Sequence, residues 1–291
     1  MKKMLQRLLI FFIGLPLVIL IVCFLPHFNH LALNLTVIVF SALGAVEIAA
    51  MLEKKQMRIS KIEALILGAL MPAAEALSLG FNWDAQVAAA FFFAGVFQVL
   101  VSGIFLRSEN FERYAGRMAA GFTTLIYPGL LLQWIIKMGR WEGAEIIIMV
   151  FLLIVMGNDS AAWAAGMLFG RGNRGIIPVS PNKSAAGFIA GGAASIAVGA
   201  VAALLFPGTF VPRFDSIFII SSALGAGIIL GLLSGLAAVL GDLSESAIKR
   251  GTGSKDSGHL MPGRGGVLDS IDSVALAAPV FYLIFTLLFK F

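Results

Sequence analysis

Nine apolar runs, each about twenty residues long, occupy most of this 291-residue chain. A helix rises about 1.5 Å per residue, so each run is long enough to cross a hydrocarbon core of about 30 Å. The runs are continuous and do not alternate with polar residues, which excludes a membrane barrel and predicts an all-α, polytopic helical bundle. The expected spans are 8–26, 31–51, 63–80, 85–106, 117–136, 145–169, 185–206, 217–241 and 270–289.

The distribution of basic residues predicts how the bundle is oriented. The first run is too long for the core of a signal peptide and lacks a small-residue cleavage site, so we expect it to be a retained span. If the N-terminus is cytoplasmic, 17 of the 21 Lys and Arg residues face the cytoplasm. The positive-inside rule favours this arrangement, in a multi-pass protein of the cell (inner) membrane. The net charge of +5 is then explained by topology, and no nucleic-acid partner is expected.

The same topology divides the chain into two regions. Residues 141–291 are expected to be the catalytic region, because the two long polar loops, 170–184 and 242–269, lie there on the cytoplasmic side. The helices of residues 1–140 are expected to form a scaffold that could provide dimer contacts.

The segment GDLSESAIKRGTGSKDSGHLMPGRGGVLDSIDS carries the densest set of polar side chains. Asp242, Ser246 and Lys249 have the spacing i, i+4, i+7 and therefore share one stripe of a helix. Asp269 and Asp272 share one face of the first turn of the last span. Carboxylates suit Mg²⁺, and glycines let backbone N–H groups approach phosphate. The cations that would meet a polyphosphate are Lys249, Arg250 and Lys255.

A simpler interpretation of this segment stays open. In it, the loop is merely solvated, and the aspartates only favour the N-terminus of the last span.

A second polar cluster precedes and follows the end of the sixth run. Asp159 lies within that run, where an ionisable residue is usually functional. The pattern Gly170-x-Gly172-x-x-Gly175 follows a helix and not a strand, so it does not indicate a dinucleotide site. Glu47 and Glu75 also lie in apolar runs, and Glu47, near the cytoplasmic end of its run, could line the same cavity. Either could instead be a structural hydrogen-bonding group, and no catalytic role is predicted for either. The loop adds the polar residues Arg171, Arg174, Ser180 and Lys183.

Together these residues predict a cytoplasm-facing site with carboxylates for a metal and cations for phosphates. Such a site at a lipid surface suggests phosphoryl or nucleotidyl transfer onto a lipid.

The polar segment also resembles a known family. The pattern Ser246-x-x-Lys249-Arg250-x4-Lys255-Asp256, followed by GHLMPGRGGVLDSIDS, closely resembles the signature of CDP-diacylglycerol synthases, also called phosphatidate cytidylyltransferases. The stretches SPNKS and NDSAAWAAG also look like elements of that family, and the resemblance covers roughly the C-terminal half. It implies that CTP and phosphatidate react to give CDP-diacylglycerol and pyrophosphate, in a membrane enzyme of about nine spans that is often a homodimer.

The resemblance further implies a role for each matching residue. The cofactor would be Mg²⁺, with a second, monovalent cation such as K⁺ left open. The implied metal ligands are Asp242, Asp269 and Asp272. The implied catalytic residues, which hold phosphates or add carboxylates, are Lys249, Arg250, Lys255, Asp256 and Asp159. The implied substrate-binding residues are Ser180, Lys183, Ser246, His259 and Arg264.

This chain departs from the family pattern at three places, the first of which is SPNKSAAG, with alanines where a large residue and Glu are common. Arg264-Gly265-Gly266 stands where His-Gly-Gly is usual, and Asp269-Ser270-Ile271-Asp272 stands where Asp-Arg-x-Asp is usual. A diverged paralogue that acts on another lipid phosphate or nucleotide therefore stays an alternative.

Two other classes fit less well. A CDP-alcohol phosphatidyltransferase would carry an Asp-Gly-x2-Ala-Arg motif, which this chain lacks. A transporter would place its polar sites near the midplane, commonly in paired repeats, whereas here the charges gather at one face and no repeat is visible.

Overall fold

The computed structural model describes residues 13–14, 16–104, 108–214, 221–261, 263 and 265–290. Across these residues the secondary structure is helical, and the β-bridges are isolated. Seven helices within these ranges are long and apolar enough to cross a membrane, which confirms the predicted all-α polytopic bundle. They are His27–Glu53, Lys61–Gly80, Phe111–Met138, Ala144–Phe169, Ala185–Leu205, Ala223–Gly251 and Leu268–Leu288.

Two of the nine predicted spans are not among these seven. The run 85–106 forms a shorter apolar helix, α4 (Ala85–Val101). In the run 8–26, residues 8–12 and 15 lie outside the described residues, and the helical residues 16–19 lead into the π-helical turn η1 (Leu20–Phe24). The count of nine spans therefore stays a prediction.

The predicted span 117–136 is a chain of three helices and not one uniform helix. After the 3₁₀ turn η2 (Ser108–Arg113), it consists of α5 (Tyr114–Thr124), the π-helix η3 (Leu125–Leu130) and α6 (Leu131–Met138). Pro128 lies within η3. Proline has no backbone N–H and its ring displaces the preceding turn, which explains the wider π-helical turn at this point.

Helix α9 (Ala223–Gly251) extends beyond the predicted end of its span at 241, so the start of the predicted loop 242–269 is helical, as the stripe of Asp242, Ser246 and Lys249 predicted. Residues 242–251 are helical because this stretch is rich in Leu, Glu, Ala, Lys and Arg and has no Gly or Pro before Gly251. Helix α10 (Leu268–Leu288) follows, so the loop itself comprises residues 252–267. The predicted start of α9, residues 217–220, lies outside the described part of the chain.

The chain divides into two compact units. The first comprises Met1–Arg140 and Ile248–Ile271, and the second comprises Trp141–Ala247 and Asp272–Phe291. The change of unit after Arg140 coincides with the predicted boundary between regions. The end of α9, the loop 252–267 and the start of α10, however, belong with the N-terminal helices.

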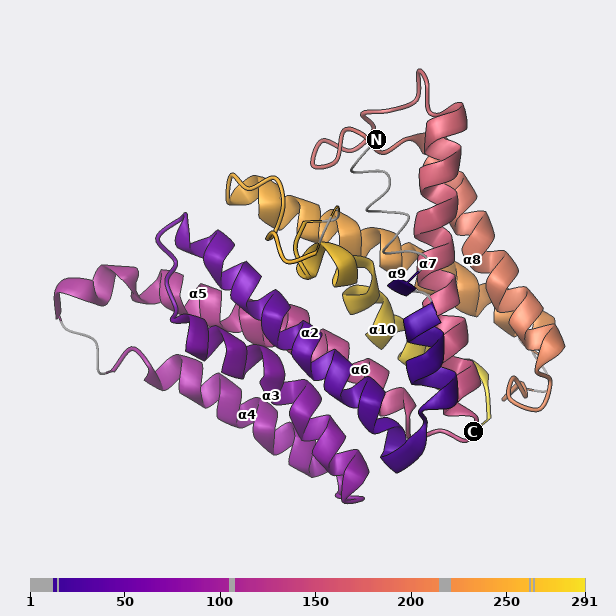
Figure 1. Ribbon diagram of the computed structural model, residues 1–291, viewed down its shortest axis with the longest axis horizontal. Coiled ribbons are helices and arrows are strands. Elements are labelled where there is room, and N and C mark those ends of the chain that lie inside the picture. The colour runs from indigo at the N-terminus through magenta and orange to yellow at the C-terminus, as the bar shows by residue number, and fades with distance from the viewer. Residues whose placement is uncertain are drawn as a thin grey trace. The chain divides into compact units, whose positions relative to one another are not determined.

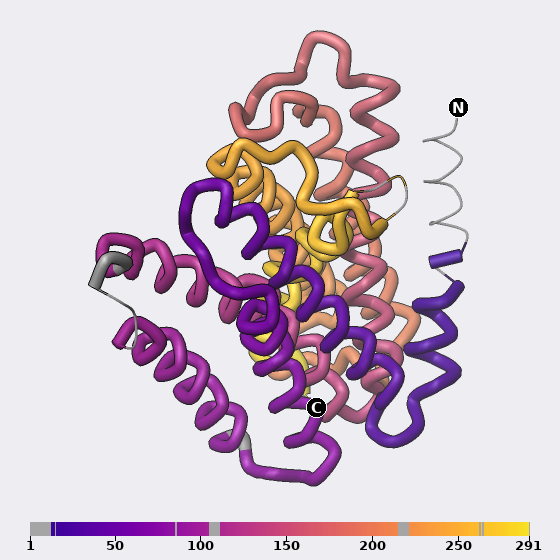
Figure 2. Tube along the Cα trace, turned by 60° about the vertical axis from the view of Figure 1, so that its left-hand side comes forward, coloured from indigo at the N-terminus to yellow at the C-terminus, as the bar shows by residue number. Residues whose placement is uncertain are grey.

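In the first unit, α2 (His27–Glu53) and α3 (Lys61–Gly80) lie side by side, with α4 along α3 (Figures 1 and 2). The Ser41 hydroxyl donates a hydrogen bond to the Gly68 carbonyl at 2.6 Å. A Cβ at Gly68 would lie 2.4 Å from Ala45 Cβ, so only glycine permits this approach. The core beside this contact contains Leu67, Met71, Val99 and Leu125.

In the second unit, α7 (Ala144–Phe169) and α8 (Ala185–Leu205) lie side by side (Figure 1). The buried Asn158 amide donates to the Ser195 hydroxyl at 2.9 Å and thereby joins these helices. A Cβ at Gly199 would lie 2.3 Å from the Gly227 carbonyl oxygen, so α8 and α9 are also in backbone contact. Close packing at small residues and a buried hydrogen bond hold these helices together, as is common in membrane bundles.

Candidate active site

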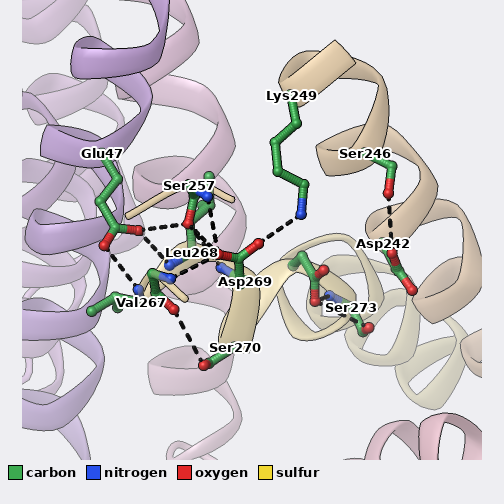
Figure 3. Close-up of polar contacts among 12 residues, drawn as sticks. Glu47, Asp242, Ser246, Lys249, Ser257, Val267, Leu268, Asp269, Ser270 and Ser273 are labelled. Atoms are coloured by element: carbon green, nitrogen blue, oxygen red, sulfur yellow. Dashed lines mark hydrogen bonds and ion pairs between the residues drawn. The ribbon is translucent and has the colours of Figure 1, made fainter. Parts of the chain in front are cut away.

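Glu47 anchors the polar loop and the start of α10 in the first unit. This residue lies in α2 and is 6% exposed. Its Oε1 accepts a hydrogen bond from the Val267 N–H at 2.9 Å, and its Oε2 accepts from the Leu268 N–H at 2.9 Å (Figure 3). The N–H groups at a helix start have no acceptor within the helix. Glu47 therefore caps α10 from a different helix.

Asp269, in the first turn of α10, is surrounded by donors. Its Oδ2 accepts from the Gly266 N–H at 2.7 Å and from the Ser257 N–H at 3.0 Å. Its Oδ1 forms an ion pair with Lys249 Nζ at 2.6 Å (Figure 3). The Asp269 side chain is 9% exposed and that of Lys249 is 14% exposed, so this charged pair is largely shielded from solvent.

Ser257 connects the two carboxylates. Its hydroxyl oxygen lies 2.9 Å from Glu47 Oε2 and 2.8 Å from Asp269 Oδ2. A serine hydroxyl has one proton and can donate to only one of them at a time. The position of one carboxylate is therefore coupled to that of the other through a single side chain.

Glycines of the loop make room for these carboxylates. A Cβ at Gly266 would lie 2.0 Å from Ser257 Oγ and 2.3 Å from Glu47 Oε2, and one at Gly258 would lie 2.3 Å from Glu47 Oε1. Gly265 has a φ of +117°, a conformation that L-residues with side chains avoid. Gly258, Gly265 and Gly266 therefore bring the backbone against carboxylates, and the phosphate contact of the loop glycines stays a prediction.

A second ion pair lies in the second unit. Lys183, from the loop 170–184, contacts Asp242 of α9, with Nζ 2.6 Å from Oδ2. Their side chains are 24% and 30% exposed. The Ser246 hydroxyl donates to Asp242 Oδ1 over a long 3.5 Å (Figure 3). Three residues predicted for the site are thus brought together, whereas Ser180 is half-buried in the loop that carries Lys183.

Asp159 and Asp272 meet at Ser273, also in the second unit. The Ser273 hydroxyl donates to Asp159 Oδ2 at 3.0 Å and lies 3.3 Å from Asp272 Oδ1. The adjoining backbone is tightly packed, since a Cβ at Gly241 would lie 2.4 Å from the Asp272 carbonyl oxygen. Asp159, predicted from its place in an apolar run, therefore lies beside one of the predicted metal ligands.

The remaining predicted residues lie elsewhere on the loop and at the end of α9. Four of them are exposed: Arg250, Lys255, Asp256 and His259. Arg264 lies outside the described residues. The loop is held at its start by Lys54, whose Nζ donates to the Ser254 hydroxyl at 2.9 Å.

The three predicted metal ligands are divided between the units, Asp269 in the first and Asp242 and Asp272 in the second. Among the residues that the structure describes, no group of three His, Cys, Asp or Glu side chains that could hold a metal ion is found. The ligand set therefore stays a prediction. Each of Asp242 and Asp269 is instead paired with a lysine.

Glu47 and Ser257 are residues of the site to which the sequence analysis assigned no role. Glu47 showed one signal, a charge within an apolar run, but its partners are 210 and more residues away in the sequence. Ser257 lies inside the signature, between Asp256 and Gly258, without a distinguishing pattern of its own.

Comparison with known proteins identifies a matching family model and several similar proteins. A model described as "Cytidylyltransferase family" matches residues 5–288. The chain is 38% identical over 142 residues to the phosphatidate cytidylyltransferase of Haemophilus influenzae, which covers 48% of this chain and 46% of that protein. It is 35% identical over 170 residues to the phosphatidate cytidylyltransferase of Brucella suis, which covers 58% of this chain and 55% of that protein.

An Escherichia coli K12 protein named uncharacterized protein YnbB is similar to the same extent. It is 36% identical over 142 residues, which is 48% of this chain and 43% of that protein. The chain thus spans about half the length of the curated relatives it matches.

Proposed function

Because the chain belongs to the cytidylyltransferase family, we propose that it transfers the cytidylyl group of CTP to phosphatidate and so forms CDP-diacylglycerol and pyrophosphate. The observation that carries the proposal is the pair of Lys249 and Asp269 at the start of an apolar helix, held by donors from a signature loop. A cation and a carboxylate at the end of a membrane span suit a reaction between a soluble nucleotide and a lipid phosphate.

The chemistry needs charge neutralisation more than proton transfer. A phosphatidate oxygen, already anionic at neutral pH, attacks the α-phosphorus of CTP. The bond from that phosphorus to the bridging oxygen breaks, and pyrophosphate leaves with the electron pair. Catalysis of such a step depends on positioning and on cations near the developing charge. In this proposal Lys249, Lys183 and the exposed Arg250 and Lys255 hold the phosphates.

We extend the proposal to a Mg²⁺ cofactor. The predicted donors Asp242, Asp269 and Asp272 are carboxylates, and hard oxygen ligands of this kind suit Mg²⁺. The metal, when bound, would neutralise charge on the phosphates and so stabilise the departure of pyrophosphate. A second, monovalent cation such as K⁺ is part of the same proposal, to be tested by ion replacement.

The apolar helices and the membrane-enzyme relatives indicate a multi-pass membrane protein. We further propose that it lies in the cell membrane with its N-terminus and site in the cytoplasm, as the positions of 17 of its 21 Lys and Arg residues favour. A homodimer is proposed as the working assembly, and cross-linking of the purified protein tests it.

The experiment is conversion of phosphatidate by the purified, detergent-solubilised protein with CTP and Mg²⁺. Wild type should form CDP-diacylglycerol, and Asp269→Asn should reduce the rate about 100-fold or more. The matched control is Asp84→Asn, because Asp84 also starts a helix in the first unit and accepts from the Gln86 N–H at 3.2 Å. A folded wild-type protein without product would contradict the proposal, and other nucleotides and lipid phosphates would then be screened.

A further inference from the structure

We infer that Glu47 is a positioning residue for the reaction, which acts through Ser257 and the start of α10 to fix the orientation of Asp269. The expected effect on catalysis rests on the proposed function. The structural part of the inference, that Glu47 holds the segment 257–269 in place, does not. Glu47 lies in α2, and no role in the reaction is assigned to it by the family signature, which lies in the C-terminal half of the chain.

The burial of Glu47 indicates that its carboxylate serves to hold other groups in place. A carboxylate in an apolar helix is costly unless donors surround it. Glu47 is 6% exposed, and each of its described donors comes from the segment 257–268: the Ser257 hydroxyl and the N–H groups of Val267 and Leu268. Gly258 and Gly266 lie close enough that a side chain on either would collide with the carboxylate. The segment is thus folded around Glu47.

The contacts of Glu47 lead directly to Asp269. Leu268, whose N–H is bound by Glu47, is the residue before Asp269 and begins α10. The Ser257 N–H donates to Asp269 Oδ2 at 3.0 Å, and the Ser257 hydroxyl, which also contacts Glu47, lies 2.8 Å from the same oxygen. The Gly266 N–H, also next to the Glu47 carboxylate, supplies a further bond of 2.7 Å. Loss of Glu47 would therefore loosen all the donors on one oxygen of Asp269.

A comparison with Glu75 separates this role from a general effect of burial. Glu75 is 3% exposed in α3 of the same unit, but its partner is Arg140, with Nη2 2.9 Å from Oε1. Arg140 also donates to the Ser78 hydroxyl at 2.8 Å. Both glutamates are buried and satisfied, yet only Glu47 contacts the signature loop. Glu75→Gln is therefore the matched control for Glu47→Gln.

The first arm of the experiment measures backbone hydrogen exchange by mass spectrometry in detergent-solubilised protein. Glu47→Gln keeps the side-chain volume but replaces one acceptor oxygen with a donor, so the N–H of either Val267 or Leu268 loses its acceptor. We expect amides in peptides that cover residues 257–269 to exchange about tenfold faster than in wild type. Glu75→Gln should leave these peptides unchanged. Unchanged exchange in folded Glu47→Gln would overturn the inference.

The second arm measures the rate of CDP-diacylglycerol formation as a function of Mg²⁺ and CTP concentration. Misplacement of a reacting group by about 1 Å costs about 100-fold, so Glu47→Gln should lower kcat by about this factor. Ser257→Ala should also lower kcat, and the double variant should be faster than the product of the two single effects predicts, because both act on Asp269. Strictly multiplicative effects, or a normal kcat in Glu47→Gln, would overturn the inference.

The two arms keep the inference distinct from the proposed function. If wild type forms no CDP-diacylglycerol, the proposed function fails, and the exchange arm still decides whether Glu47 holds the loop. If wild type is active and Glu47→Gln behaves as wild type in both arms, only the inference fails. A monodisperse elution profile and an unchanged Tm show that each variant is folded.

Discussion

Lys249 Nζ lies 2.6 Å from Asp269 Oδ1, and this ion pair joins the last turn of α9 to the first turn of α10 within the first unit. Asp269 is held at its other oxygen by backbone N–H groups, so the carboxylate is fixed from two sides. Lys249 carries its charge at the end of a four-carbon stem with several rotatable bonds. It is the member of the pair that can turn toward a phosphate.

The first prediction concerns that lysine. Lys249→Met keeps most of the side-chain volume but removes the charge, and we expect kcat/KM for CTP to fall about 100-fold to 1000-fold, because the cation stabilises phosphate charge in the transition state. Initial rates of CDP-diacylglycerol formation measure this. The control is Lys61→Met, since Lys61 is an exposed lysine at the start of α3. A normal rate in Lys249→Met would show that the pair is only structural.

The second prediction concerns the pair in the second unit. Lys183 and Asp242 are partly exposed, so their ion pair contributes about 1 kcal/mol or less to the free energy of unfolding. Lys183→Ala should therefore leave the Tm nearly unchanged while raising the KM for CTP, if this lysine holds a phosphate. Arg171→Ala, an exposed cation in the same loop, is the control. A lowered Tm with an unchanged KM would assign Lys183 a structural role.

The third prediction tests the tight packing of the signature glycines. Gly266→Ala should abolish activity or folding, because the new Cβ would lie 2.0 Å from Ser257 Oγ. Gly251→Ala is the matched change in the same segment, where no atom lies within 4 Å of the new Cβ, and it should retain activity. Expression, elution profile and rate are compared for the two variants. Equal behaviour would contradict the described loop geometry.

The fold could be predicted from the sequence more fully than the site. Backbone polar groups must be satisfied in lipid, so the long apolar runs can hardly form anything but helices, and seven are confirmed. The stretch 242–251 was counted with the cytoplasmic loop, although the spacing of Asp242, Ser246 and Lys249 predicted a helical stripe there. Residues such as Glu245 and Lys249 are good helix formers, and α9 continues until Gly251.

In the site, contacts within one helix could be predicted from the sequence, whereas contacts between residues far apart in the sequence could not. The stripe of Asp242 and Ser246 follows from helical spacing, and their hydrogen bond is seen in the structure. The role of Glu47 does not follow from any local pattern. Its contact with Ser257 joins residues 210 positions apart, and it depends on how α2 packs against the loop. Side-chain packing of this kind is not encoded in a short motif.

The fourth prediction concerns the metal. Removal of divalent cations with a chelator should abolish CDP-diacylglycerol formation, and Mg²⁺ should restore it, because the proposed donors are carboxylates. Asp242→Asn and Asp272→Asn should each raise the Mg²⁺ concentration required for half-maximal rate. Full activity in the presence of excess chelator would contradict a divalent cofactor.

The central claim is transfer of the whole cytidylyl group, and the fate of the individual phosphates of CTP tests it most directly. Purified protein is incubated with phosphatidate and with CTP that carries a radioactive label either at the α- or at the γ-phosphorus. The account predicts that the α label enters the lipid fraction and that the γ label appears in pyrophosphate. Label from the γ-phosphorus in the lipid, or no label in the lipid from either position, would contradict it.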